Sequence, residues 1–240
     1  MSDLFLQKIS LKKEMVENFK RYPFNIDIIK NFDSLELSCP VTFLIGENGT
    51  GKSTFIEALA VKCGLNAEGG TQNFNFRTRE THSSLYEYLE VNHFERKCET
   101  KFFLRAESFY NLASEIDTLG VSGYGMNSLH ACSHGESFIQ LIENRFTPNG
   151  LYILDEPEAA LSPTRQMTLL YLIHELVKQG CQFIIATHSP ILISYKYGKI
   201  LDLNNNFAEI DYQDTEIYQV YKMYLDNPDA MQERLFNKND

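Results

Sequence analysis

Eight consecutive residues in the first quarter of the chain have the types and spacing needed to bind phosphate. They are Gly46-Glu47-Asn48-Gly49-Thr50-Gly51-Lys52-Ser53, which fit G-x-x-x-x-G-K-[ST] at every fixed position. The glycines allow the backbone to turn with its N–H groups inward, where they and a helix N-terminus form an anion-binding hole. Lys52 would bridge the β- and γ-phosphates of a nucleotide, and Ser53 would hold Mg²⁺. The loop from Gly46 to Thr54 therefore predicts a binding site for ATP·Mg²⁺.

Two carboxylates follow an apolar run further along the chain. Leu151–Leu154 is typical of a buried strand, and Asp155 and Glu156 come directly after it. Ligands bind at the carboxyl edge of open α/β sheets, so both acids are expected beside the phosphate loop. Asp155 would orient the Mg²⁺ shell, directly or through water, and Glu156 would act as general base on the attacking water. The alternative is that these acids only begin a helix, a position that acidic residues favour.

The elements needed to position these groups can be predicted from the hydrophobic pattern. Strands are expected at 4–11, 40–45, 74–76, 101–104, 151–154 and 183–186, and a terminal hairpin at 200–203 and 207–210. Helices are expected at 54–62, 107–116, 135–145, 163–178 and 215–225, the last with tyrosines that pack on the sheet or dock a partner. Buried strands that alternate with helices indicate an α/β fold with a largely parallel sheet covered on both faces. We expect one domain over 1–240, with an antiparallel N-terminal β portion.

Composition narrows the class of protein. Lys and Arg total 22 and Asp and Glu total 32, a net charge of −10, which argues against a surface that grips nucleic acid everywhere but leaves a local basic groove open. The cysteines are odd in number, scattered and without a CxxC pair, which favours reduced thiols in the cytoplasm. No apolar run approaches the ~20 residues of a membrane helix, and the N-terminus has no signal-peptide core. A cytoplasmic protein without direct membrane insertion is expected.

Three further motifs, which lie before, at and after Glu156, resemble those of the ABC ATPase superfamily. Glu156–Ser162 is similar to the run that joins the catalytic acid of the Walker B strand to the D-loop, and Ala186–Ser189 is similar to the switch-histidine motif. Cys132–Glu136 resembles a degenerate LSGGQ signature, with His134 and Glu136 in place of its first glycine and its glutamine. More narrowly, the chain resembles small stand-alone bacterial ATPases that are labelled AAA but have ABC-like motifs.

The resemblance implies a P-loop ATPase head with a small helical subdomain at about 107–145. Lys52, Glu156 and His188 would then be catalytic, with His188 sensing the γ-phosphate. Two copies would sandwich two ATP molecules head to tail, so that Ser133, Gly135 and Glu136 of one copy complete the Walker A site of the other.

Two positions of the expected site are less well defined by the sequence. Glu107 occupies the place of the Q-loop glutamine and is a candidate to orient water or metal, but it could also form a local ion pair with Arg105. Tyr22 and Phe24, which precede the phosphate-loop strand, are candidates to stack on adenine, but ordinary packing would also explain them.

The cellular task of such an ATPase has three alternatives. A stand-alone homodimer with a nucleic-acid, repair or defence role, using a nucleic-acid or protein partner, is favoured. The missing Q-loop glutamine and the short segment between Glu107 and Ser133 argue against a membrane transporter subunit. A nucleotide-controlled interaction switch with weak turnover is the third alternative.

Overall fold

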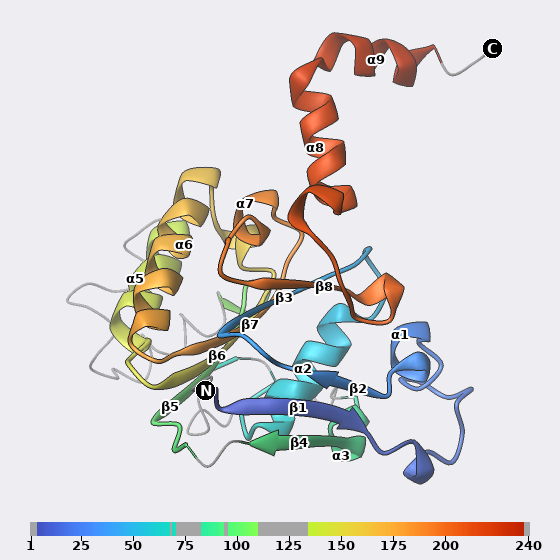
Figure 1. Cartoon of the computed structure of the whole chain (residues 1–240), viewed down its shortest axis with the longest axis vertical. Coiled ribbons are helices and arrows are strands. Elements are labelled where there is room, and N and C mark those ends of the chain that lie inside the picture. Colours follow the sequence, from blue (N-terminus) through green and yellow to red (C-terminus); the bar gives the residue numbers. More distant parts are fainter. Residues whose placement is uncertain (1–3, 68, 71–82, 94–95, 110–133, 238–240) are drawn as a thin grey trace.

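The computed structural model of the chain describes residues 4–67, 69–70, 83–93, 96–109 and 134–237. Its larger sheet has the strand order β5-β6-β7-β3-β8-β9 (Figure 1). The strands are Thr100–Arg105 (β5), Gly150–Asp155 (β6), Gln182–Ala186 (β7), Val41–Ile45 (β3), Lys199–Asp202 (β8) and Ala208–Glu209 (β9). Neighbours from β5 to β8 pair in parallel, and β9 turns back antiparallel to β8. The predicted parallel sheet and terminal hairpin are confirmed.

The central strands are apolar along their whole length because both faces of the sheet are covered. Phe43 and Leu44 are neighbours on β3, yet they belong to hydrophobic clusters on opposite faces, as do Ile153 and Leu154 on β6. All four residues are fully buried. Strands covered on both sides appear in a sequence as continuous apolar runs, which is why these could be located before the structure.

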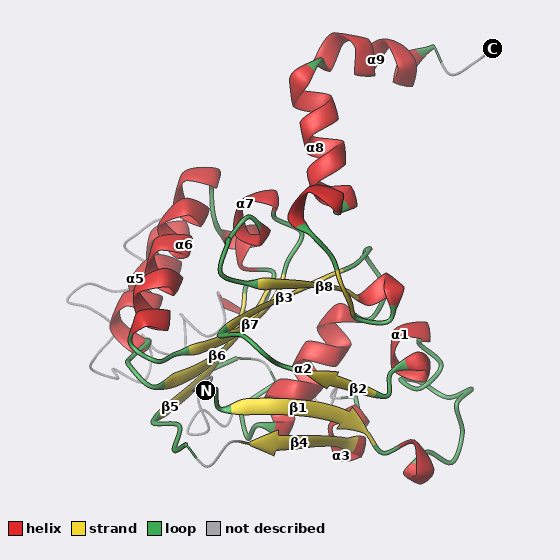
Figure 2. Cartoon of the chain, in the orientation of Figure 1, coloured by secondary structure: helices red, strands yellow, loops and turns green. Residues whose placement is uncertain are grey.

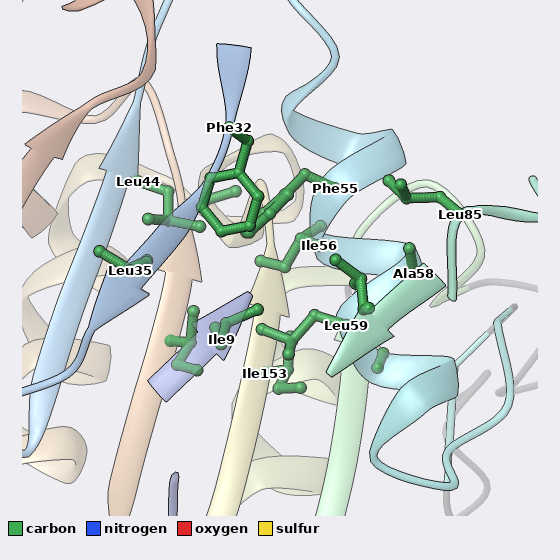
Figure 3. Close-up of a cluster of buried hydrophobic side chains, with 14 of the residues drawn as sticks. Ile9, Phe32, Leu35, Leu44, Phe55, Ile56, Ala58, Leu59, Leu85 and Ile153 are labelled. Carbon is green, nitrogen blue, oxygen red and sulfur yellow. The ribbon is translucent and has the colours of Figure 1, made fainter. Parts of the chain in front are cut away.

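Helices lie on both faces of this sheet (Figure 2). Lys52–Lys62 (α2) covers the face of Leu44 and Ile153, against which Phe55 and Ile56 pack (Figure 3). His134–Arg145 (α5), Pro163–Lys178 (α6) and Pro190–Ile193 (α7) cover the other face. The β-to-α alternation therefore places the carboxyl ends of β3, β6 and β7 along one edge of the sheet.

A second, antiparallel sheet closes over α2, in the order β2-β1-β4. Its strands are Ser34–Glu36 (β2), Leu6–Leu11 (β1) and Leu89–His93 (β4), and the short helices Asp27–Asn31 (α1) and Leu85–Tyr88 (α3) lie beside it. Gln182 at the start of β7 joins the two sheets: its Oε1 accepts from Phe5 N and Leu6 N at 2.8 and 2.9 Å, and its Nε2 donates to Leu6 O at 3.1 Å. The predicted antiparallel N-terminal portion is thus present.

The chain continues past the sheets into two helices that stand away from the body, Glu216–Asp226 (α8) and Pro228–Phe236 (α9) (Figure 1). Packing of the whole tyrosine face against the sheet, one of the two expectations, is wrong. Tyr221 and Tyr224 are 51% and 39% exposed, because α8 leaves the sheet rather than lying on it.

No helix in the described ranges is long and apolar enough to cross a membrane.

Several predicted features fall partly or wholly on residues outside the described ranges. The strand expected at 74–76 lies wholly outside them, and so do residues 110–133 of the expected helical subdomain. Of the helix expected at 107–116, only the first residues are described, and Glu107 lies in a turn after β5.

Candidate active site

The phosphate loop joins β3 to α2 at the carboxyl edge of the large sheet. Gly51 is the N-cap of α2 with φ at +101°, a conformation that glycine adopts without steric cost. A Cβ on Gly51 would also lie 2.7 Å from Ile26 Cγ2, so the loop packs closely on the segment before α1. This turn starts α2 at Lys52 instead of the predicted residue 54, which brings Lys52 and Ser53 onto its first turn.

The ammonium group of Lys52 is buried inside the loop. The residue is 4% exposed, and its Nζ donates to the carbonyl oxygens of Gly46 and Glu47 at 2.7 and 3.0 Å. Burial lowers the pKa of Lys52, and nearby carboxylates, chiefly that of Glu156, oppose this shift. A buried charge whose hydrogen bonds go to neutral carbonyls would gain from charge-assisted bonds to phosphate oxygens.

Ser53 and Asp155 meet beside the loop, although they come from α2 and β6. Ser53 Oγ donates to Asp155 Oδ1 at 3.4 Å. Asp155 is 2% exposed, and burial raises its pKa to about 6, while Arg105 opposes that rise. Hydroxyl and carboxylate oxygens are ligands that Mg²⁺ takes together with substrate phosphates and water. The pair therefore fits a Mg²⁺ ion that arrives with a nucleotide.

Arg105, the last residue of β5, places a positive charge next to this pair. Its Nε lies 3.3 Å from Asp155 Oδ2, and its Nη1 lies 3.0 Å from Glu57 Oε2. Glu107 also pairs with Arg105, through Oε2 and Nη2 at 3.3 Å, but its side chain is 82% exposed. The structure thus brings Glu107 to Arg105, as the ion-pair alternative expected, and connects it to Asp155 only through that arginine.

Glu156 and His188 face each other at the ends of β6 and β7. Glu156 Oε1 lies 3.7 Å from His188 Nε2. The backbone of Glu156 has a φ of +48°, a strained value for a residue other than glycine. Its N–H donates a hydrogen bond to Ala186 O at 2.9 Å. Burial and then the charge of Lys52 lower the pKa of His188, while Glu156 raises it, so the imidazole is neutral at neutral pH. Within the described ranges, the buried Nε2 of His188 has no hydrogen-bond partner, so its hydrogen-bonding capacity is unused.

The signature-like residues His134, Gly135 and Glu136 lie at the start of α5, whereas Cys132 and Ser133 are outside the described residues. Gly135 packs so closely that a Cβ would lie 2.7 Å from Arg165 Nη1 and 3.0 Å from Ala160 O. Glu136 Oε1 forms an ion pair with Arg165 Nη2 at 2.8 Å. Gly135 and Glu136 therefore contact α6 and the segment just before it in their own chain.

Comparisons with known proteins find ATPase domains and ATP-binding proteins similar to this chain. A model described as an AAA domain matches residues 15–128, and one described as an AAA ATPase domain matches residues 117–193. The hemin import ATP-binding protein HmuV of Bartonella henselae is 26% identical over 204 residues, 72% of this chain and 74% of that protein. An ABC transporter ATP-binding protein of Haemophilus influenzae is 25% identical over 219 residues, covering 81% and 82% of the two chains. The chain is therefore similar to AAA ATPase domains and to the ATP-binding proteins of ABC transporters.

Two solved structures also match the chain, at lower sequence identity. The SMC head domain from Thermotoga maritima matches with a TM-score of 0.45 and 17% identity, over 82% of this chain and 95% of that one. A putative metal-chelate type ABC transporter in an inward-facing conformation matches with a TM-score of 0.48 and 17% identity, over 80% and 82% of the two chains.

The hollow that adjoins the phosphate loop is not lined by Tyr22 or Phe24, the residues expected to stack on adenine. Tyr22 is 59% exposed and lines a hollow of about 380 Å³ with Phe24 and Tyr88, to which no phosphate-loop residue contributes. Phe24 is packed edge-on against Tyr88, with ring centroids 4.7 Å apart, so the packing alternative holds for Phe24 but not for the exposed Tyr22. A separate hollow of about 430 Å³ adjoins the loop. Its lining is Asn25, Ile26, Asp27, Ile28, Asn31, Gly49, Thr50, Leu203, Asn204 and Asn206.

Two site residues were missed by sequence reasoning. Arg105 was considered only as a surface ion pair, although it ends a strand that pairs in register with β6, Arg105 opposite Asp155. Glu158 was seen only as part of a motif, yet its carboxylate binds the loop that carries His188. The order of strand ends at one sheet edge could have suggested Arg105, whereas no local signal marks Glu158.

Proposed function

We propose that the chain binds ATP·Mg²⁺ at the edge formed by β3, β6 and β7 and hydrolyses its terminal phosphoanhydride. Lys52 would hold the β- and γ-phosphates together with the loop N–H groups of residues 46–54. Ser53 and Asp155 would hold Mg²⁺, which supplies charge neutralisation on the phosphates when it is bound. The observation that carries this proposal is the convergence of Lys52, Ser53 and Asp155 with the Glu156–His188 pair.

In this proposal Glu156 is the general base. Its carboxylate would accept a proton from the water that attacks the γ-phosphorus, and ADP would leave in line with that attack. Its half-exposed side chain, 42% accessible, gives water a path to it. His188 would donate from its neutral imidazole to a γ-phosphate oxygen, which accounts for the unpartnered Nε2 beside Lys52.

We assign the adenine of the nucleotide to the hollow beside Gly49 and Thr50. Its apolar wall is formed by Ile26 and Ile28, and asparagine amides such as Asn25 and Asn204 offer donors and acceptors for a base edge. Pockets of this kind, with an apolar wall and few polar groups, bind small planar ligands. Tyr22 keeps only a peripheral place in this proposal.

The working unit in this proposal is an ATP-dependent homodimer in a role other than membrane transport, acting on a nucleic-acid or protein partner. Ser133, Gly135 and Glu136 of one copy would close the site of the other. The absence of a glutamine after β5, where Arg105 and Glu107 form their ion pair, supports a non-transporter role. The names of the relatives favour the alternative, an ATP-binding subunit of a transporter, which predicts stable association with a membrane protein of the same organism.

Substitution of the proposed base tests the catalytic assignment. Glu156→Gln keeps the size and polarity of the side chain but cannot take a proton, so kcat for ATP hydrolysis should fall by about 10²–10⁴-fold. ATP affinity, measured by fluorescence with a labelled nucleotide, should change little because Lys52 and Ser53 are intact.

Glu143→Gln, an exposed glutamate on α5, is the matched control and should retain wild-type turnover. Undiminished hydrolysis by Glu156→Gln would remove Glu156 from the base role. Loss of nucleotide binding in that variant would instead show that Glu156 helps to shape the binding site.

A further inference from the structure

The carboxylate of Glu158 lies directly against the loop that carries His188. Glu158 Oε2 accepts a hydrogen bond from Thr187 Oγ1 at 2.7 Å, and Glu158 Oε1 accepts one from the backbone N–H of His188 at 2.5 Å. Glu158 stands in the 3-10 turn Pro157–Ala160 that follows Glu156. One side chain thus links the segment of the proposed base to the histidine opposite it.

The same loop is anchored at two more points, so little freedom is left to its backbone. Thr187 N donates to Leu44 O on β3 at 3.2 Å. Ser189 Oγ donates to Gln166 Oε1 at 2.6 Å, and Gln166 Nε2 donates to Leu161 O at 3.0 Å. Thr187 and Ser189 are buried. The side chain of His188 is the part of this loop that stays available to a ligand.

The two carboxylate oxygens of Glu158 are already used as acceptors, which separates its role from that of Glu156. Burial raises the pKa of Glu158, and the bonds from His188 and Thr187 oppose that rise. Glu156 has a half-exposed carboxylate within 3.7 Å of His188 Nε2, where water can reach it. Glu158 is therefore placed to hold the histidine loop rather than to accept a proton from water.

We propose that Glu158 is the positioning residue of His188: its two hydrogen bonds hold the histidine backbone so that Nε2 faces Glu156 and the phosphate loop. The inference rests on the proposed function, in which His188 contacts the γ-phosphate. A displacement of about 1 Å in a reacting group can cost about 10²-fold in rate. Glu158 acts through His188 and does not itself touch the nucleotide.

A double-mutant cycle tests this role. Glu158→Ala should lower kcat by about 10²-fold while KM for ATP stays within about twofold, because the binding groups are separate. In a His188→Ala background the same substitution should cause almost no further loss, since residues that act through one another are not additive. Glu143→Ala provides the matched control, with no effect in either background.

The conservative variant gives a second readout. In Glu158→Gln the amide oxygen can accept from the His188 N–H, and the amide NH₂ can donate to Thr187 Oγ1, which accepts as well as donates. This variant should therefore recover most of the rate lost in Glu158→Ala. If Glu158→Ala does not fold, Thr187→Val, which removes one of the two bonds, takes its place in the cycle.

The outcomes separate this inference from the function on which it rests. Two outcomes overturn the positioning role alone. In the first, His188→Ala lowers kcat but Glu158→Ala does not. In the second, Glu158→Ala lowers kcat equally in the wild-type and His188→Ala backgrounds. A His188→Ala variant with wild-type kcat removes His188 from the chemistry, and the role of Glu158 falls with it. Equal losses in Glu158→Gln and Glu158→Ala would show that charge, not hydrogen bonding, is what Glu158 supplies.

Discussion

At the scale of single residues, burial sets the charge balance of the site. Burial disfavours the charged form of any ionisable group, and here it lowers the pKa of Lys52 and raises that of Asp155. The ligand proposed for the site brings phosphate charge to Lys52 and a cation to Asp155. Each residue is therefore held in a state that costs free energy without the ligand and is relieved by it, a common cost of functional sites.

Asp155 should consequently destabilise the ligand-free protein at neutral pH. Raising its pKa from the ordinary 3.8 to about 6 corresponds to about 3 kcal/mol. Because the folded-state pKa is the higher one, this cost is absent only well below pH 3.8, grows as the pH rises to about 6, and is constant above that. Asp155→Asn should raise the free energy of unfolding at pH 7.5 by about 2–3 kcal/mol, measured by urea denaturation without nucleotide or Mg²⁺.

The gain from Asp155→Asn should fall below about 1 kcal/mol at pH 4, where the folded-state carboxyl is protonated and the unfolded-state carboxyl is only partly ionised. Asp211→Asn, an exposed aspartate, should show no such pH-dependent gain. A less stable Asp155→Asn at pH 7.5 would mean that the Arg105 ion pair outweighs the burial of the charge.

At the scale of elements, the side chain of Gln182 joins the two sheets by hydrogen bonds to backbone groups, as a neighbouring strand would. Gln182 satisfies Phe5 N, Leu6 N and Leu6 O at once, and it is 1% exposed. Gln182→Leu would leave three buried backbone groups without partners, at about 1–3 kcal/mol each. We expect the free energy of unfolding to fall by roughly 3 kcal/mol or more, seen as a lower urea midpoint.

The exposed Gln179→Leu, three positions earlier, serves as the control for this substitution and should change the midpoint little. Nucleotide binding at saturating ATP should survive in both variants, because Gln182 lies at the opposite end of β7 from His188. A Gln182→Leu protein as stable as wild type would mean that water replaces the amide at the junction.

The elements that sequence could predict are those whose signals are local. β3, β6 and β7 are continuous apolar runs, and the ends of α6 are marked by Ser162 before it, by Pro163 at its first position and by Gly180 after it. Strands β2 and β4 were missed because they are short, partly polar edges that exist only through pairing with β1. The same division holds in the site: Lys52 and Ser53 follow from a motif, whereas Glu158 acquires its role only from a partner 30 residues away.

At the scale of the whole molecule, the sheet edge proposed to bind the nucleotide lies next to the start of α8, which continues into α9. A hollow of about 240 Å³ lies between Glu47 and His188 on one side and Ile217 and Tyr221 of α8 on the other. Beyond it, Leu225 and Phe236 are 69% and 74% exposed. A second copy that covers the phosphate loop would therefore also contact the N-terminal part of α8.

Closure by a second copy can be tested at the signature-like segment. In the Glu156→Gln background, ATP·Mg²⁺ should convert monomers into dimers, measured by size-exclusion chromatography with light scattering. Adding Ser133→Arg should weaken that dimer at least about tenfold, because a bulky cation would be desolvated at the place proposed for a hydroxyl-to-phosphate contact. ATP binding by the monomer should persist, since Lys52 and Ser53 belong to the other half of the site. Ser84→Arg, at an exposed serine beside α3, should leave the dimer intact, and a dimer equally indifferent to Ser133→Arg would contradict closure in trans.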